Sequence, residues 1–179
     1  VSKEGAGRQY KLINYADIQD GVLQTENLKT CLVQKNVEGC LVRTGDILVS
    51  CKGAQIKTCI VPETAEGALL SLNFIGLRLK KQLYCPEFLL HYLNSPVGLS
   101  YLRGRQVGTS IVTLKNEDLR QMPIPPVPFE LQAEYTKEYA KACREIEEAV
   151  RRLRLEREQE TWKLYHRMGL KSVLSKAQE

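Results

Sequence analysis

A run of 40 residues without proline or glycine, 129–168, constrains the fold of this chain more than any other feature. The run follows the proline-rich stretch 122–128, and proline is well tolerated in the first turn of a helix because its fixed φ suits the helix. The stretch therefore predicts one long helix that begins at Phe129 and continues to about Gly169. At ~1.5 Å per residue, such a helix is about 60 Å long.

Apolar residues recur along this predicted helix in alternating steps of four and three residues. This spacing is the a/d pattern of a coiled coil, which places the residues in one seam along the helix. The register breaks across residues 156–160 and resumes with Trp162. The predicted seam residues are Tyr135, Tyr139, Ala142, Ile146, Ala149, Leu153 and Trp162.

The predicted helix is too long to pack along its whole length on the domain that precedes it, residues 1–128. The seam therefore requires a second helix, which would come from another chain or from a further part of this one. The alternative is an amphipathic helix that folds back onto its own domain. The sequence pattern leaves both interpretations open.

Residues 1–128 show a mixture of strand and helix patterns. Segments 10–17 and 69–79 are typical of strands, and segment 46–61 predicts a hairpin around the turn at Gly53. Segment 22–37 is mixed and polar and predicts loop with at most one short strand. Short helices are expected over 86–94 and 97–102. The sequence thus predicts an α+β fold: a globular, mixed-sheet domain over 1–128, followed by one long coiled-coil-type helix within 129–179.

The formal net charge of +5 is concentrated in the middle of the chain. Residues 78–120 contain seven lysines and arginines against three acidic residues, whereas residues 1–77 contain eight of each kind. A local basic surplus on a folded domain favours a polyanion partner, most often nucleic acid. An ordinary solvated surface is the alternative interpretation.

The sequence contains none of the common catalytic or cofactor-binding motifs that we sought. It has no Gly-x-Ser-x-Gly nucleophile motif, no phosphate-binding loop and no dinucleotide fingerprint. It also has no stretch of 18 apolar residues, so no membrane span is expected. These observations favour a binding module over an enzyme, and they predict no catalytic residue and no cofactor.

The cysteines offer no metal site by their spacing. None of the six forms a Cys-x-x-Cys pair, and the chain has only two histidines, so no zinc site is predicted. Cysteines scattered among apolar neighbours are typical of buried free thiols in a reducing cytosol. We therefore expect structural thiols at Cys31, Cys40, Cys51, Cys59, Cys85 and Cys143.

Several segments occur in an order that is typical of one protein family. Thr44-Gly-Asp-Ile-Leu-Val-Ser-Cys-Lys-Gly53 is followed by Leu83-Tyr-Cys-Pro-Glu-Phe-Leu-Leu-His-Tyr-Leu-Asn-Ser95, by Met122-Pro-Ile-Pro-Pro-Val127 and by Gln132 with the long helix. In this order and spacing, the segments resemble a target-recognition domain of the DNA specificity subunit of type I restriction–modification systems. The resemblance extends from about residue 10 to about residue 169.

The resemblance implies a non-catalytic DNA-binding subunit that reads one half of a bipartite site and holds methyltransferase subunits on its helix. Such subunits typically carry two recognition domains, separated by two helices that pair as an antiparallel coiled coil. This chain has one domain and one helix, so it is either half of a longer chain or a half-subunit that forms a homodimer. A homodimer would read an inverted repeat. The resemblance further implies the cytoplasm of a bacterium or archaeon, and leaves open a restriction subunit as an additional partner.

DNA reading requires basic groups that neutralise phosphates and side chains that reach base edges. Glycine-containing loops at 52–57 and 103–110 combine both kinds of residue, and a basic strand end lies at 78–81, for which a solvated surface is the alternative. The predicted DNA-contact residues are Lys52, Gln55, Lys57, Arg78, Lys80, Lys81, Arg103, Arg105, Gln106, Thr109 and Ser110.

Two other functions fit the same sequence. One is a protein-interaction adaptor that dimerises through its C-terminal helix and has no salt-dependent affinity for DNA. The other is the recognition fragment of a fused restriction–modification enzyme, whose catalytic domains would lie outside this sequence.

Overall fold

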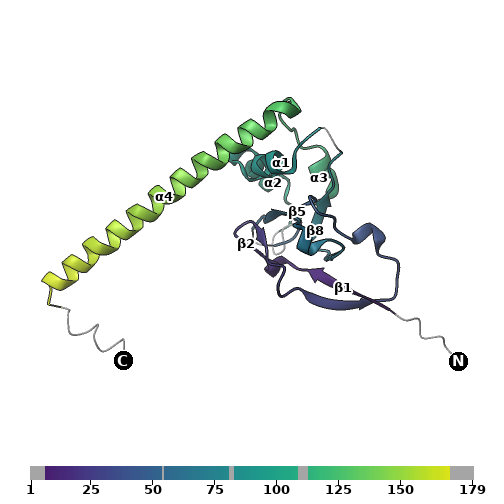
Figure 1. Ribbon diagram of the computed structural model, residues 1–179, viewed down its shortest axis with the longest axis horizontal. Coiled ribbons are helices and arrows are strands. Elements are labelled where there is room, and N and C mark those ends of the chain that lie inside the picture. Colours follow the sequence, from purple (N-terminus) through teal and green to yellow (C-terminus); the bar gives the residue numbers. More distant parts are fainter. Residues whose placement is uncertain (1–6, 54, 81–82, 109–112, 170–179) are drawn as a thin grey trace. The chain divides into compact units, whose positions relative to one another are not determined.

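The computed structural model describes residues 7–53, 55–80, 83–108 and 113–169. The chain divides into two compact units, Val1–Thr136 and Lys137–Glu179. The first unit is the predicted α+β domain, and the second consists of most of the long helix (Figure 1). The division lies within that helix, whereas the sequence analysis placed it at residue 128.

The described residues of the first unit form three small sheets. The strands are β1 (Arg8–Ile13), β2 (Ile18–Gln19), β3 (Val22–Leu23), β4 (Lys29–Val33), β5 (Ile47–Ser50), β6 (Thr58–Ile60), β7 (Leu69–Leu70) and β8 (Phe74–Leu77). β1 lies between β4, which is antiparallel to it, and β7, which is parallel. β2 and β3 form a hairpin, and β5 lies between β6 and β8, antiparallel to both. The predicted mixed sheet and the predicted hairpin over 46–61 are therefore confirmed.

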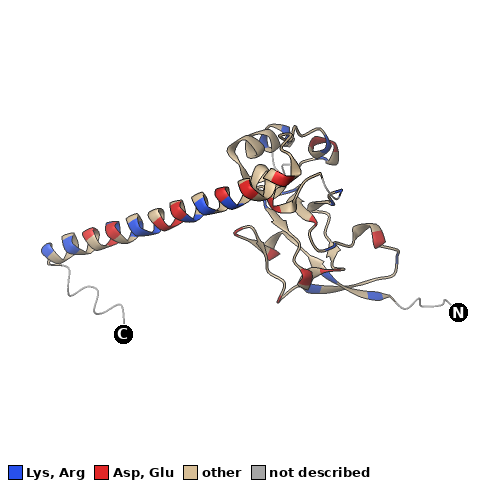
Figure 2. Cartoon of the chain, turned by 45° about the horizontal axis from the view of Figure 1, so that its top comes forward, with Lys and Arg blue, Asp and Glu red and all other residues tan. Residues whose placement is uncertain are grey.

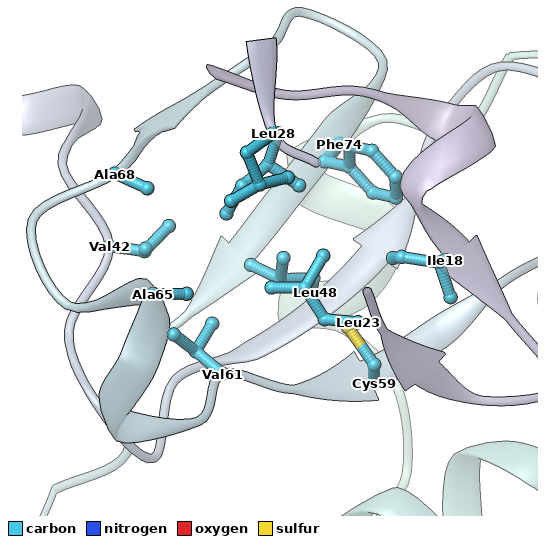
Figure 3. Close-up of a cluster of buried hydrophobic side chains, with 11 residues drawn as sticks. Ile18, Leu23, Leu28, Val42, Leu48, Cys59, Val61, Ala65, Ala68 and Phe74 are labelled. Carbon is cyan, nitrogen blue, oxygen red and sulfur yellow. The ribbon is translucent and has the colours of Figure 1, made fainter. Parts of the chain in front are cut away.

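The middle strand β5 is apolar at successive positions because both of its faces are covered. Leu48 points into a core formed with residues of the β1–β4 region, β6 and β8, among them Ile13, Cys59 and Phe74, and Figure 3 shows this cluster. Ile47 and Val49 point to the other face, into a second core with the helices. All three side chains are 0% exposed. A strand with this role is the scaffold on which the adjoining loops are placed.

Three short helices cover the second core. They are α1 (Pro86–Asn94), α2 (Pro96–Arg105) and α3 (Asn116–Arg120), and α1 and α2 pack side by side (Figure 1). The side chains of Cys85 and Ser95 accept hydrogen bonds from the backbone N–H groups that open α1 and α2. Both helices begin with proline, which the first turn tolerates. Predicted helix 86–94 is confirmed, and the predicted helix 97–102 is longer than expected.

Two segments differ from the expectation. The predicted strand over 10–17 ends at Ile13, because the Asp17 carboxylate accepts a 2.7 Å hydrogen bond from the backbone of Asn14 and closes a 3₁₀ turn over Tyr15–Asp17. Segment 22–37 was expected to be loop with at most one short strand, and it contains two strands, β3 and β4. β4 is an edge strand with mostly exposed side chains, so its sequence lacks the apolar alternation that reveals a strand.

The six cysteines are free thiols, but only Cys51 and Cys59 are buried. Cys40 is exposed, and the expectation of burial is wrong for it, because a surface 3₁₀ turn over Glu38–Cys40 carries it. Cys31, Cys85 and Cys143 are of intermediate exposure. Burial raises the pKa of the Cys59 thiol to about 12, which keeps that thiol protonated and unreactive at neutral pH.

The predicted long helix is confirmed as α4, Phe129–Arg167. Figure 2 shows lysines and arginines interspersed with acidic residues along it. Ion pairs Lys141–Glu145 and Lys163–Glu160 lie on its surface, with the spacing that stabilises an exposed helix. No helix in the described ranges is long and apolar enough to span a membrane.

Candidate nucleic-acid interface

The two loops that the sequence analysis singled out lie together at the end of β5. The backbone of Lys52 forms a bridge with Thr113, and Val107 forms a second bridge with the same residue. Leu114 donates a 2.9 Å hydrogen bond to the carbonyl of Cys51, next to these bridges. Segment 52–57 and the segment that follows α2 are therefore neighbours, although about 50 residues separate them in the sequence.

Basic side chains of both segments are exposed at this end of the domain. Lys52, Arg103 and Arg105 all face solvent. Arg103 and Arg105 stand in the last turn of α2, where the helix dipole favours cations. The Arg105 guanidinium carbon lies 5.1 Å from the ring centroid of Tyr101, in a cation–π contact. Three cations are thus available for an anionic partner such as the phosphates of DNA.

The second loop contains three further predicted DNA-contact residues, Gln106, Thr109 and Ser110. Gln106 follows α2 as its C-terminal cap and is half-buried. Thr109 and Ser110 lie outside the described residues.

Lys57 holds the domain together through its ammonium group. It donates hydrogen bonds of 3.1 and 2.7 Å to the backbone carbonyls of Tyr15 and Ile18, and it lies 4.3 Å from the centroid of the Tyr15 ring. These contacts fasten segment 55–58 to the turn that precedes β2. DNA contact by Lys57 stays a prediction, and its charge is already engaged within the domain.

The predicted DNA-contact residues at 78–81 differ in their contacts, since Arg78 is paired with Asp46 and Lys80 is exposed. Both Nε and Nη2 of Arg78 donate to the carboxylate of Asp46, at 2.9 and 2.7 Å, and Nη2 also donates to the carbonyl of Leu41. Hydrogen bonding to Asp46 raises the pKa of the Arg78 guanidinium. Asp46 is 5% exposed, so the pair supplies the counter-charge that a buried carboxylate needs. Lys80 is exposed, and Lys81 lies outside the described residues.

A polar cleft of about 670 Å³ lies against segment 55–58. Its walls are the β2–β3 turn, segment 55–58 and the end of α1. The lining residues with polar side chains are Gln19, Asp20, Gln55, Lys57, Thr58 and Asn94. Gln55 and Lys57 were predicted from the sequence, but Gln19, Asp20 and Asn94 were not. The dipeptide Asp20-Gly21 is typical of a turn, but its proximity to segment 55–58 depends on the tertiary structure.

The start of α4 is tied into the domain by a buried glutamine. Gln132 is 0% exposed. Its Oε1 accepts a 2.8 Å hydrogen bond from the backbone of Cys85, and its Nε2 donates 2.9 Å hydrogen bonds to the carbonyls of Leu83 and Val127. These three bonds explain why the first compact unit extends to Thr136.

The predicted seam residues of α4 are largely exposed in this chain. Tyr135 and Tyr139 are 47% and 41% exposed, and Ile146 and Leu153 are 62% and 61% exposed. Ala142 is exposed, and Ala149 is half-buried. An exposed apolar stripe of this kind is typical of an interaction surface.

Trp162 lies apart from the other six predicted seam residues. It stands nine residues after Leu153, which is about two and a half turns of an unbroken helix, so the two residues face opposite sides of α4. The Trp162 ring contacts the ring of Tyr165 edge-on, with centroids 6.3 Å apart. Leu164, eleven residues after Leu153 and thus about three turns away, shares the side of the seam instead.

The described residues contain no group of three or more potential ligands that could hold a metal ion. His91 is the one histidine in the first unit. Partial burial lowers its pKa, and the nearby Glu87 carboxylate opposes that effect.

Comparisons with known proteins connect this fold to one family of subunits. The HsdS subunit from Thermoanaerobacter tengcongensis superposes with a TM-score of 0.68 at 23% identity, over 89% of this chain and 42% of that chain. A second solved chain comes from a structure on complex assembly and conformational transition of the type I R-M system. It superposes with a TM-score of 0.69 at 24% identity, over 94% of this chain and 44% of that chain. The chain has the fold of part of an HsdS subunit.

The resemblance stated from the sequence is thus confirmed at the level of the fold, including the α+β domain and the long helix after it. This chain spans less than half of the length of either solved chain. No protein-family model and no curated protein matches the sequence.

Proposed function

We propose that this chain is the DNA-reading half of a type I restriction–modification specificity subunit. The observation that carries the proposal is the shared fold with HsdS over about nine-tenths of this chain. The convergence of two basic loops at Thr113 supports it, because a polyanion that contacts Lys52 can also reach the basic end of α2. The chain supplies recognition and no catalysis of its own.

Lys52, Arg103 and Arg105 neutralise DNA phosphates in this proposal. Such contacts fix the register of the protein on the duplex and carry no sequence information. Their signature is an affinity that falls as salt rises, since each neutralised phosphate releases condensed counterions. Lys80, Lys81, Thr109 and Ser110 remain further proposed contacts, and Gln55 and Gln106 are proposed readers of base edges.

α4 supplies the assembly surface in the same proposal. The six residues from Tyr135 to Leu153 pair with the equivalent helix of a second copy, which produces a homodimer that reads an inverted repeat. Methyltransferase subunits bind the outer faces of the paired helices. The complex operates in the cytoplasm of a bacterium or archaeon.

Binding of the full chain to double-stranded DNA over a range of salt concentrations tests the proposal. We expect the logarithm of the affinity to fall linearly with the logarithm of the salt concentration. The triple variant Lys52→Ala, Arg103→Ala, Arg105→Ala should lower that slope by roughly one for each lost phosphate contact.

A charge-matched control is the triple variant Lys11→Ala, Lys29→Ala, Lys35→Ala, which removes three exposed lysines of the β1–β4 region. It should leave the slope close to that of the wild type. A wild-type chain without salt-dependent affinity for DNA would refute the proposal and favour the protein-interaction adaptor. Equal slopes for the two triple variants would refute the position of the interface.

A further inference from the structure

The polar cleft beside the β2–β3 turn has chemistry that differs from the basic surface at the end of β5. Its charged side chains are one carboxylate, Asp20, and one ammonium, Lys57, so their charges cancel. The Lys57 ammonium already donates to the carbonyls of Tyr15 and Ile18. A phosphate would meet no free cation among these lining residues. The cleft therefore suits a neutral polar ligand better than an anion.

Some polar groups of the lining are satisfied within the domain and others are not. The Thr58 hydroxyl donates a 2.8 Å hydrogen bond to Oδ1 of Asn94. By contrast, the side chains of Gln19, Asp20 and Gln55 are exposed and make no hydrogen bond or ion pair with the described residues. Two amides and one carboxylate therefore remain available to a ligand.

The backbone that carries these groups is held firmly. The carbonyl of Gln55 accepts hydrogen bonds from the hydroxyls of Tyr15 and Ser50, at 2.9 and 3.2 Å. Asp20 has φ 49° and is the one non-glycine residue with a positive φ in the described ranges. It forms the tight turn with Gly21, φ 77°, as expected for a two-residue hairpin loop. Groups on fixed backbone lose less entropy on binding than groups on a loose loop.

We propose that Gln19 and Gln55 read a base pair in the DNA groove, with adenine as the preferred base. An amide donates and accepts at once, which matches the acceptor N7 and the donor N6 of adenine, whereas a basic side chain matches guanine. This inference rests on the proposed function. It adds that the two groups of residues have different roles: Lys52, Arg103 and Arg105 position the duplex, and the neutral cleft lined by segment 55–58 specifies its sequence.

Selection from a library of duplex DNA with a randomised core tests the inference, with the full chain as the bait. The wild type should enrich a motif that contains at least one A·T pair. Gln19→Ala or Gln55→Ala should reduce the preference at such a position roughly tenfold, while other positions keep their preferences. The salt dependence of binding should not change, because both side chains are neutral.

Gln55→Glu provides a variant whose effect cannot come from unfolding. A carboxylate accepts from N4 of cytosine, so this variant should gain a preference for cytosine at the position that Gln55 reads. Gln9→Ala is the matched control, since Gln9 is an exposed glutamine on β1 outside the cleft. It should enrich the wild-type motif.

The possible results separate this inference from the proposed function. If the wild type enriches no motif, sequence reading itself is refuted. If the wild type enriches a motif that the Gln19 and Gln55 variants enrich unchanged, the chain reads DNA elsewhere and the role of the cleft is refuted. A folded variant that loses affinity equally for all sequences also refutes that role, because base readers act at single positions.

Discussion

In the unit that ends at Thr136, the large side chains of β5 are 0% exposed, whereas Ile146 and Leu153 of α4 are 62% and 61% exposed. Both regions carry regular apolar patterns. In the first, successive residues of β5 point alternately into two cores that the same chain completes. In the second, the seam of α4 leaves most of its apolar surface uncovered in this chain. The first pattern is completed within this chain, whereas the second leaves an exposed apolar stripe that the proposed function assigns to a partner helix.

This comparison predicts that substitutions in the two regions have different observable effects. Core substitutions should change the free energy of unfolding of the globular unit. Seam substitutions should change assembly and leave that free energy almost unaltered.

Leu48→Ala should have the largest effect on folding. Leu48 is 0% exposed in the centre of the first core, so its truncation leaves a cavity and should cost about 3–5 kcal/mol. Urea unfolding, followed by circular dichroism, measures this change. Leu72→Ala is the control, because Leu72 is 87% exposed and should change stability by about 0.5 kcal/mol or less. Similar losses in both variants would contradict the assignment of Leu48 to the core.

Gln132→Leu should destabilise the same unit by about 2–3 kcal/mol. Leucine fills the space but leaves the N–H of Cys85 and the carbonyls of Leu83 and Val127 without their partner. Each buried group without a hydrogen bond costs about 1–3 kcal/mol, and added apolar burial offsets part of the sum. The same unfolding experiment measures the loss, with the exposed Gln9→Leu as its control. A neutral result would mean that the start of α4 does not depend on Gln132.

His91 should give a smaller and pH-dependent effect. Burial lowers its pKa in the folded chain, so the unfolded chain binds the proton more readily as the pH falls through the ordinary histidine range. Its contribution to stability is therefore present above about pH 6.5 and declines below it. Unfolding curves at pH 7 and pH 5 should differ less in His91→Gln than in the wild type. An unchanged difference would assign the acid sensitivity to other groups.

Ile146→Glu combined with Leu153→Glu should leave the unfolding of the globular unit almost unchanged. Light scattering should nevertheless report about twice the chain mass for the wild type and a single chain for this variant, because carboxylates disrupt a paired apolar seam. Leu155→Glu with Trp162→Glu is the matched control, since both positions are exposed and lie away from the seam. A monomeric wild type would refute the homodimer.

The helices of the first unit illustrate which features local sequence can predict. Segment 86–94 was predicted correctly because proline, a helix-compatible apolar face and the break at Ser95-Pro96 all lie within it. The sequence did not locate β4 within segment 22–37, because β4 is an edge strand with exposed side chains and little apolar pattern. Gly98 shows what local sequence cannot predict. A Cβ at this position would lie 2.1 Å from the carbonyl oxygen of Tyr92, and the residues around Gly98 do not reveal this close approach.

The sequence by itself determined the long helix, its apolar seam, the α+β class and the basic surplus after residue 77, because each depends on residue type and local spacing. Only the tertiary structure decided which lysine is free and which is engaged. Lys52 and Lys57 stand in the same loop, yet Lys52 is exposed and Lys57 binds two carbonyls about 40 residues away in the sequence. The cleft likewise depends on the approach of three distant segments, and such contacts follow from packing of the whole domain rather than from local pattern.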